Sequence, residues 1–268
     1  MLLPEHAKPI SITNSMCVSS RDDVFARWLT ALEARQLADF RVAEVTRALR
    51  ALSSAYVQRR HQLSRGAALD SAGKRAAFAL FYGPLHFLTV AHVIGALHRE
   101  APAPSDVVDL GCGTGVAGAA WSLCAGGTPR IIGVDRHPWA IEESRWTYRA
   151  LGLRGHARIG DLSRLPTLSA SSAVVAAYTL NELAEGRRRA VEEHLLAAAA
   201  RGTRVLIVEP IARAVTPWWN ESAGRVKALG GRADDWRFPA DLPPMLKLLD
   251  KAAGLNHQEL TARSLYLG

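Results

Sequence analysis

The chain has 268 residues, of which 49% are hydrophobic, so it can bury one large core, or the cores of a catalytic domain and a smaller one. No continuous apolar run reaches the roughly 18 residues of a membrane span, and three unclustered cysteines argue against a disulfide scaffold or a CxxC metal site. The net charge is +8, and residues 1–100 carry 13 Lys and Arg against 8 Asp and Glu. This charge fits a nucleic-acid partner or simply a soluble basic surface. Because the cysteines do not form a disulfide scaffold, a cytoplasmic protein is the simplest interpretation.

The first 100 residues are predicted to form an all-helical N-terminal region. Apolar side chains recur every three to five positions, charged residues fill the gaps, and glycine and proline mark the ends of the segments. In chain order, the predicted features are a helix at 21–62, a polar break at 64–73, a second helix at 76–97 interrupted at Gly83-Pro84, and an Ala-Pro linker at 101–104. We therefore place a domain boundary near residue 100, with a second domain over residues 101–268.

The second domain is predicted to be a doubly wound, Rossmann-like α/β sheet. Short apolar runs rich in β-branched residues alternate with helical patterns, which is typical of parallel strands covered by helices on both faces. The predicted strands are 106–110, 130–134, 157–160, 173–178 and 204–209, and the helices between them are 116–124, 139–151 and 186–200. A helix over 243–253 and a strand or hairpin over 257–267 end the chain.

A glycine-rich turn follows the first predicted strand, in the segment Asp109-Leu110-Gly111-Cys112-Gly113-Thr114-Gly115. Its glycines allow a tight turn and a close approach of a ligand, and the next helix presents N–H groups that favour a carboxylate. The GxGxG spacing after an acid resembles motif I of the class I methyltransferases, which bind S-adenosylmethionine. The resemblance assigns Asp109, Gly111, Cys112, Gly113 and Gly115 to that cofactor. A purely structural turn and a dinucleotide site remain the alternatives.

Two further acids follow the next two strands. Asp135 ends the second strand, about twenty residues beyond the glycine loop, where a carboxylate can accept hydrogen bonds from both ribose hydroxyls. We assign Asp135 and the adjacent Arg136 to the cofactor, with a helix cap as the alternative role for the aspartate. Asp161 and Leu162 follow the third strand. The family resemblance implies that this acid meets the adenine amino group and that the next backbone N–H meets the ring, whereas an ordinary turn aspartate is the alternative.

The fourth strand leads into candidate residues for the substrate end of the site. Asn181 and Glu182 are placed to orient a methyl acceptor or to take its proton, and Tyr178 precedes them as a further catalytic or pocket-lining residue. A helix cap and a first-turn acid are the alternative roles of Asn181 and Glu182. The Asn/Asp-Pro-Pro-Tyr motif of base-amino methyltransferases is absent at this position. The spacing of the cysteines and histidines gives no metal pattern, so we expect no metal.

As a whole, the chain resembles the methyltransferase-like proteins of the mitochondrial small ribosomal subunit and their bacterial relatives. The resemblance covers roughly residues 50–210 and implies a role in ribosome assembly or translation. The cysteines that hold an iron–sulfur cluster in many members are absent here. The segments that show this resemblance are Leu52–Tyr56, Arg75–Pro84, Asp109–Gly115, Ala177–Leu183 and Val208–Pro210.

Three functions fit these observations. The first is a methyltransferase acting on RNA, with small-subunit ribosomal RNA as the specific candidate, and phosphate contacts expected at Arg59, Arg60, Arg65, Lys74 and Arg75. The second is a small-molecule methyltransferase whose N-terminal helices form a lid. The third is a ribosome-assembly or RNA-binding protein with weak or no catalysis. A basic groove beside the glycine loop would favour the first, a closed apolar pocket the second, and a blocked pocket the third.

Overall fold

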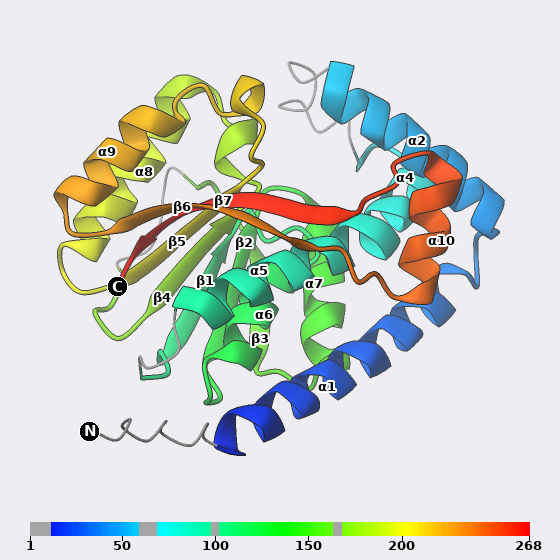
Figure 1. Cartoon of the computed structure of the whole chain (residues 1–268), viewed down its shortest axis with the longest axis horizontal. Helices are drawn as coiled ribbons and strands as arrows, with labels where there is room; N and C mark the ends of the chain where they lie inside the picture. The colour runs from blue at the N-terminus through cyan, green and yellow to red at the C-terminus, as the bar shows by residue number, and fades with distance from the viewer. Residues whose placement is uncertain (1–11, 59–68, 98–101, 163–167) are drawn as a thin grey trace, which may run out of the picture.

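The computed structural model describes residues 12–58, 69–97, 102–162 and 168–268, and a seven-stranded sheet lies at its centre (Figure 1). The strand order is β3-β2-β1-β4-β5-β7-β6. The strands are β1 (Asp106–Leu110), β2 (Arg130–Asp135), β3 (Gly155–Ile159), β4 (Ala173–Ala177), β5 (Arg204–Glu209), β6 (Arg232–Pro239) and β7 (Glu259–Leu267). Strands β1 to β5 run parallel, and β7 is antiparallel to both of its neighbours.

Helices cover both faces of this sheet. They are α6 (Val116–Cys124), α7 (Pro138–Ala150), the short η3 (Leu180–Glu182), α8 (Glu185–Ala199), η4 (Arg213–Val215), α9 (Trp219–Ala228) and α10 (Pro244–Ala253). The chain order reverses between the neighbouring strands β1 and β4, and in such a sheet a ligand binds outside the carboxyl ends of the strands at that point. The predicted doubly wound α/β fold is therefore confirmed.

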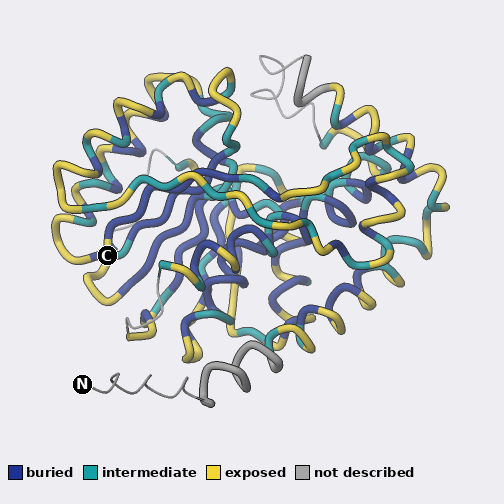
Figure 2. Tube along the Cα trace, in the orientation of Figure 1, coloured by how far each residue is buried: buried dark blue, intermediate teal, exposed yellow. Residues whose placement is uncertain are grey.

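The core has two parts because side chains alternate along each strand. Within β1, Val107 belongs to the cluster that packs under α5 to α7, whereas Val108 and Leu110 belong to the cluster under α8 and α9. The strands run as a buried band through the centre of the molecule in Figure 2. This double burial explains why the strands appear in the sequence as nearly continuous apolar runs.

The N-terminal region consists of α1 (Ile12–Gln36), α2 (Val42–Gln58), α4 (Ala72–Ala77), η2 (Phe78–Tyr82) and α5 (Gly83–Leu97). The single helix predicted over residues 21–62 is wrong, because the chain breaks between Gln36 and Val42. The Arg41 backbone N–H donates to Glu44 Oε2 at 2.8 Å, which satisfies a donor at the start of α2 as in a capping box. Residues 59–62 of that prediction lie outside the described residues.

The predicted interruption at Gly83-Pro84 is also wrong. Residues 72–97 form one continuous helical stretch, in which a π-helical turn, η2, directly precedes Gly83. A proline in a regular helix removes a hydrogen bond and collides with the carbonyl four residues earlier, and the wider π turn leaves room for Pro84. Gly83 also approaches the glycine loop, because a Cβ there would lie 3.3 Å from Thr114 Oγ1.

The helical stretch Ala72–Leu97 is long and apolar enough to cross a membrane. It contains no uninterrupted apolar run of about 18 residues, so the sequence analysis did not identify it. However, 72% of its most apolar window is buried inside the protein. Its apolar side chains are therefore accounted for by packing within the fold.

The N-terminal helices pack on the sheet domain through a shared apolar cluster. The rings of Phe25 and Phe87 stack at 4.8 Å, and Trp28 stacks on Phe87 at 5.9 Å. Helix α1 lies along α7 (Figure 1), and Arg35 on α1 forms an ion pair with buried Glu143 on α7 at 2.9 Å. The N-terminal helices thus share their core with the sheet, and the domain boundary near residue 100 stays a prediction.

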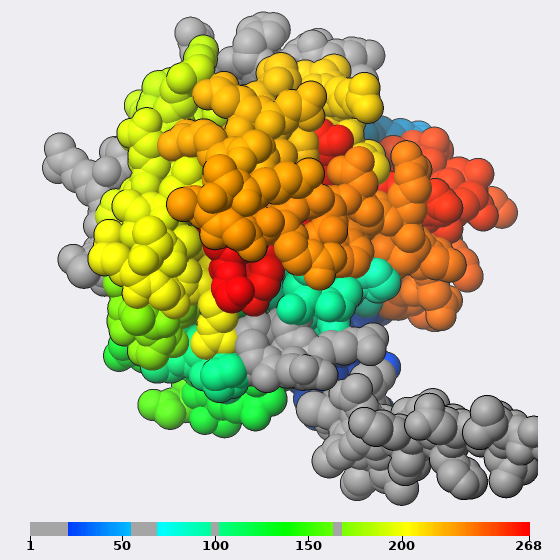
Figure 3. Space-filling model, turned by 60° about the vertical axis from the view of Figure 1, so that its left-hand side comes forward, coloured from blue at the N-terminus to red at the C-terminus, as the bar shows by residue number. Residues whose placement is uncertain are grey.

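Helix α9 and strand β6 were not predicted. Strand β6 lies at the sheet edge with charged residues along it, so it lacks the apolar run of a central strand. The C-terminal segments form much of the surface in Figure 3. At the start of α9, the Trp218 ring lies under Arg188 at 4.7 Å and the Trp219 ring lies under Arg263 at 4.8 Å. Neither tryptophan lines the cofactor cavity described below.

Candidate cofactor and substrate cavity

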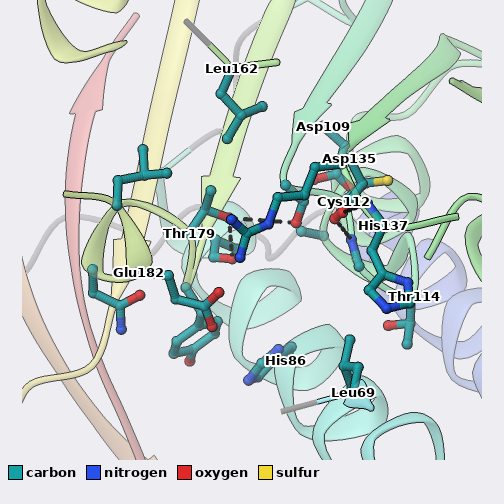
Figure 4. A pocket seen from close by; sticks show the side chains of 18 of the residues that line it. Leu69, His86, Asp109, Cys112, Thr114, Asp135, His137, Leu162, Thr179 and Glu182 are labelled. Carbon is teal, nitrogen blue, oxygen red and sulfur yellow. Dashed lines mark hydrogen bonds between the residues drawn. The ribbon is translucent and has the colours of Figure 1, made fainter. Parts of the chain in front are cut away.

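A cavity of about 710 Å³ lies at the carboxyl ends of β1 to β4, within the roughly 300–1,000 Å³ typical of ligand sites. Its wall includes the ends of these strands, the start of α6 and residues of η2 and α5. Figure 4 shows Asp135, His137 and Thr114 on one side of it, and Glu182 on the other. The structure therefore brings residues from both halves of the chain to the point where the chain order reverses between β1 and β4.

Asp135 ends β2 and faces the glycine loop. Its Oδ2 accepts a hydrogen bond from the Gly113 N–H at 3.0 Å, and its Oδ1 accepts one from the His137 N–H at 2.8 Å. His137, rather than Asp135, is the N-cap of α7. The capping role considered for Asp135 is therefore wrong. Its carboxylate fixes the loop and the residue that caps α7 while it lines the cavity.

The three glycines of the loop have different environments. A Cβ on Gly113 would have no neighbour closer than 3.9 Å, so this position is open. A Cβ on Gly111 would lie 2.5 Å from Thr179, and one on Gly115 would lie 2.7 Å from Ser144 Cβ. All three have positive φ, which favours glycine. Gly111 and Gly113 line the cavity, but Gly115 does not, because it packs against α7.

Asp109 lies beneath the loop and is 1% exposed. Its Oδ2 accepts a hydrogen bond from the Gly118 N–H in the first turn of α6 at 2.8 Å. The pKa of Asp109 is raised to about 7, mainly by burial and to a lesser extent by the charge of Asp135, while the Gly118 hydrogen bond opposes the shift. Cys112 lines the cavity beside it, and burial raises the pKa of the Cys112 thiol well above its ordinary value.

The other predicted cofactor residues also line the cavity. Arg136 comes from the end of β2, and Asp161 and Leu162 come from the end of β3, where Ile159 and Gly160 add to the wall. Apart from Gly115, every predicted cofactor residue thus lies at the cavity. Which cofactor atom each of them meets stays a prediction.

The predicted substrate-side residues lie together beyond β4. Tyr178 has a left-handed backbone with φ 55°, and Tyr178, Asn181 and Glu182 all line the cavity. Glu209 Oε1 accepts hydrogen bonds from the Leu180 N–H at 2.8 Å and the Asn181 N–H at 3.2 Å, which holds this turn in place. Burial raises the pKa of the Tyr178 hydroxyl, and a hydrogen bond with Thr89 partly offsets that shift.

Sequence reasoning missed the residues that the N-terminal helices contribute. Leu69, Phe78, Tyr82 and His86 all line the cavity. The His86 ring stacks on the Tyr178 ring with a centroid distance of 3.9 Å. The histidine spacing considered for a metal gave no sign of this contact, which depends on how α5 packs across β4. Among the residues that the structure describes, no group of three His, Cys, Asp or Glu could hold a metal ion.

Part of the chain that forms this cavity matches a known family of domains. Residues 107–204 match the family described as a methyltransferase domain, whereas a search of curated proteins finds no match. Among solved structures, the chain is similar to the mitomycin 7-O-methyltransferase MmcR, with 18% identity and a TM-score of 0.51, covering 89% of this chain and 71% of that one. It is also similar to the magnesium protoporphyrin IX methyltransferase ChlM from Synechocystis PCC 6803, with 13% identity and a TM-score of 0.45, covering 69% of this chain and 84% of that one.

The matched segment holds the glycine loop, Asp135 and Asp161, so it forms the sheet end of the cavity. The likeness to MmcR supports the fold. The protein is an S-adenosylmethionine-dependent methyltransferase. The resemblance to the ribosomal family stays a prediction.

The residues present fit this cofactor. The open position at Gly113 lets a ligand approach the loop backbone, and the Asp135 carboxylate stands beside it as an acceptor for hydroxyl groups. Asp161 and Leu162 line the same cavity. Asp135, Arg136, Asp161, Leu162 and the glycine loop would therefore hold the cofactor at the sheet end, leaving the helical end for a substrate.

Proposed function

We propose that this methyltransferase acts on a small molecule bound beneath the N-terminal helices. The observation that carries the proposal is the wall formed by Leu69, Phe78, Tyr82 and His86, which covers the cavity opposite the predicted catalytic turn. Concave sites with mostly apolar and aromatic walls and a few polar groups are typical of small-molecule sites. The N-terminal helices are thus a lid over the substrate end.

Two of the predicted phosphate contacts, Lys74 and Arg75, lie among the described residues, and their contacts within the chain give less support to an RNA substrate. Arg35 pairs with Glu143, Lys74 pairs with Asp70 at 3.0 Å, and Arg75 donates to the Leu69 carbonyl at 3.4 Å. Phosphate contacts require basic groups that face outward from one surface, whereas these three contact other parts of the chain. Arg59, Arg60 and Arg65 lie outside the described residues, so RNA methylation and the ribosomal role stay predictions.

When bound, S-adenosylmethionine supplies a methyl group that is already activated by its sulfonium leaving group. The protein therefore has to align the substrate, exclude water and accept the substrate's proton. Glu182 is the group proposed to take this proton, and Asn181 is proposed to orient the substrate. The Leu180 and Asn181 N–H groups donate hydrogen bonds to Glu209. These bonds fix the turn that carries the Asn181 and Glu182 side chains.

The test is transfer of a tritiated methyl group from labelled S-adenosylmethionine into a metabolite extract, total RNA and ribosomal subunits in parallel. We expect label in the small-molecule fraction, and a loss of about 10²- to 10⁴-fold in rate for Glu182→Gln, the usual range for removal of an acid–base group. Glu185→Gln is the control, because Glu185 is exposed at the start of α8 outside the cavity. Label confined to RNA or to ribosomal subunits would overturn the proposal.

A further inference from the structure

His86 lines the cavity, and the proposed reaction gives it no role. It lies in the first turns of α5, and three aromatic rings hold its imidazole in place. The Tyr178 ring stacks on it at 3.9 Å with an interplanar angle of 16°, the edge of Phe78 meets it at 6.1 Å, and Tyr82 lies 6.0 Å away. In Figure 4, His86 lies on the same side of the cavity as Glu182, away from Asp135 and His137.

The imidazole of His86 forms no hydrogen bond with any residue that the structure describes. A neutral imidazole has one donor nitrogen and one acceptor nitrogen, and polar groups shielded from water normally find partners. Its neighbours offer ring faces and edges, which fix the ring plane but do not bind the nitrogens. Because His86 lines the cavity, a ligand bound there can supply a partner for its nitrogens.

The imidazole is also uncharged. Burial among these rings lowers the pKa of His86 to about 3, so the neutral form predominates near pH 7. A neutral imidazole can accept a hydrogen bond, whereas an imidazolium can only donate. The cavity therefore presents an acceptor nitrogen at its substrate end.

Asn181 lines the same cavity, and its buried Oδ1 has no hydrogen-bond partner among the described residues. The neutral acceptor nitrogen of His86 favours a substrate that brings a hydrogen-bond donor. The aromatic walls of Phe78 and Tyr82 favour a planar body, because rings pack well in stacked and edge-to-face arrangements.

We propose that His86 binds a hydroxyl or amine group of an aromatic substrate, which donates its hydrogen bond to the neutral His86 imidazole. This inference rests on the proposed small-molecule function and narrows it to aromatic substrates with an O–H or N–H donor. The hydrogen bond fixes the substrate in the cavity, and the methyl-accepting group is a separate group of the same substrate whose proton Glu182 takes. His86 is thereby a specificity-determining residue.

The test measures probe binding to the complex of the full chain with S-adenosylhomocysteine. The probes are 2-naphthol, 2-naphthylamine and 2-methylnaphthalene, which have similar shapes and differ in hydrogen-bond donors. We expect the wild type to bind 2-naphthol or 2-naphthylamine about 3- to 10-fold more tightly than 2-methylnaphthalene, the effect of one neutral hydrogen bond. Tighter binding of 2-naphthol than of 2-methylnaphthalene would indicate a hydroxyl substrate, and tighter binding of 2-naphthylamine would indicate an amine substrate.

Substitutions then assign the preference to His86. His86→Phe keeps a stacking ring and loses both nitrogens, so it should abolish the preference, and His86→Gln should restore part of it. His92→Phe is the matched control, because His92 lies on the same helix and stacks on Phe238 at 3.9 Å outside the cavity. In ¹⁵N spectra of the wild type, the acceptor nitrogen of His86 should shift with 2-naphthol or 2-naphthylamine and stay unchanged with 2-methylnaphthalene.

The proposal is overturned if His86→Phe keeps the preference, or if the wild type binds neither protic probe more tightly than 2-methylnaphthalene. These results would leave the small-molecule function standing whenever label still enters the metabolite fraction. Label confined to RNA would instead remove the proposed function and this inference together. Calorimetry with S-adenosylhomocysteine shows that each variant is folded, because its affinity should match that of the wild type.

Discussion

The two ends of the cavity are built in different ways. The sheet end is made by turns that directly follow β1, β2 and β3, so each cofactor residue is placed by the strand before it. The helical end brings His86 against Tyr178, although four strands separate these residues in the chain. Local chain geometry thus creates the first half of the site, whereas tertiary packing creates the second, where enzymes of one fold can differ in substrate.

The sheet end depends on backbone space, so its glycines should be the most sensitive positions. Gly115→Ala should destabilise the protein by about 2–5 kcal/mol, because it combines a left-handed backbone with overpacking against Ser144. Gly224→Ala, in α9 with open space around it, should stabilise by about 0.5–1 kcal/mol. Urea denaturation of the two variants checks both signs. Equal stability of Gly115→Ala and the wild type would contradict the packing described for the loop.

The buried acid at the sheet end should make stability depend on pH. The folded chain keeps a proton on Asp109 up to a pKa of about 7, whereas the unfolded chain loses it near 3.8, so the stability of the wild type should fall as pH rises between these values. Asp109→Asn has no charge to bury and should gain stability relative to the wild type, by up to about 4 kcal/mol at pH 7 and above. Chemical denaturation from pH 4 to pH 8 checks this, and parallel curves for the two proteins would refute it.

The helical end depends on how firmly α1 is held against α7. Arg35→Ala removes the ion pair with Glu143 and the contact with the Trp146 ring, so it should cost about 1–3 kcal/mol. Arg237→Ala breaks an exposed pair with Glu259 and should change stability by less than about 0.5 kcal/mol. Thermal unfolding compares the two variants. Equal losses would show that the Arg35 contact does not anchor the N-terminal helices.

The same contrast explains how much could be predicted from the sequence. The strand at 106–110, the helix at 116–124 and the strand at 204–209 match the structure to the residue, because apolar runs and glycine turns are local signals. Asp135 was predicted from its place at the end of a strand, whereas the roles predicted for Asp109 and Asp161 came from the family resemblance. The role of His86 could not be predicted, because it depends on a π turn before Pro84 and on packing across the sheet. Strand β6 was missed because an edge strand can be polar along its length.

We propose that one cavity holds the cofactor at its sheet end and a separate substrate site at its helical end. Calorimetric titration of S-adenosylhomocysteine into the wild type, Asp135→Ala and His86→Phe tests it most directly. Asp135→Ala should weaken binding by about 10- to 150-fold, the range for hydrogen bonds to a charged group, and His86→Phe should bind within about twofold of the wild type. Unchanged affinity in Asp135→Ala, or equal losses in both variants, would contradict the division of the cavity.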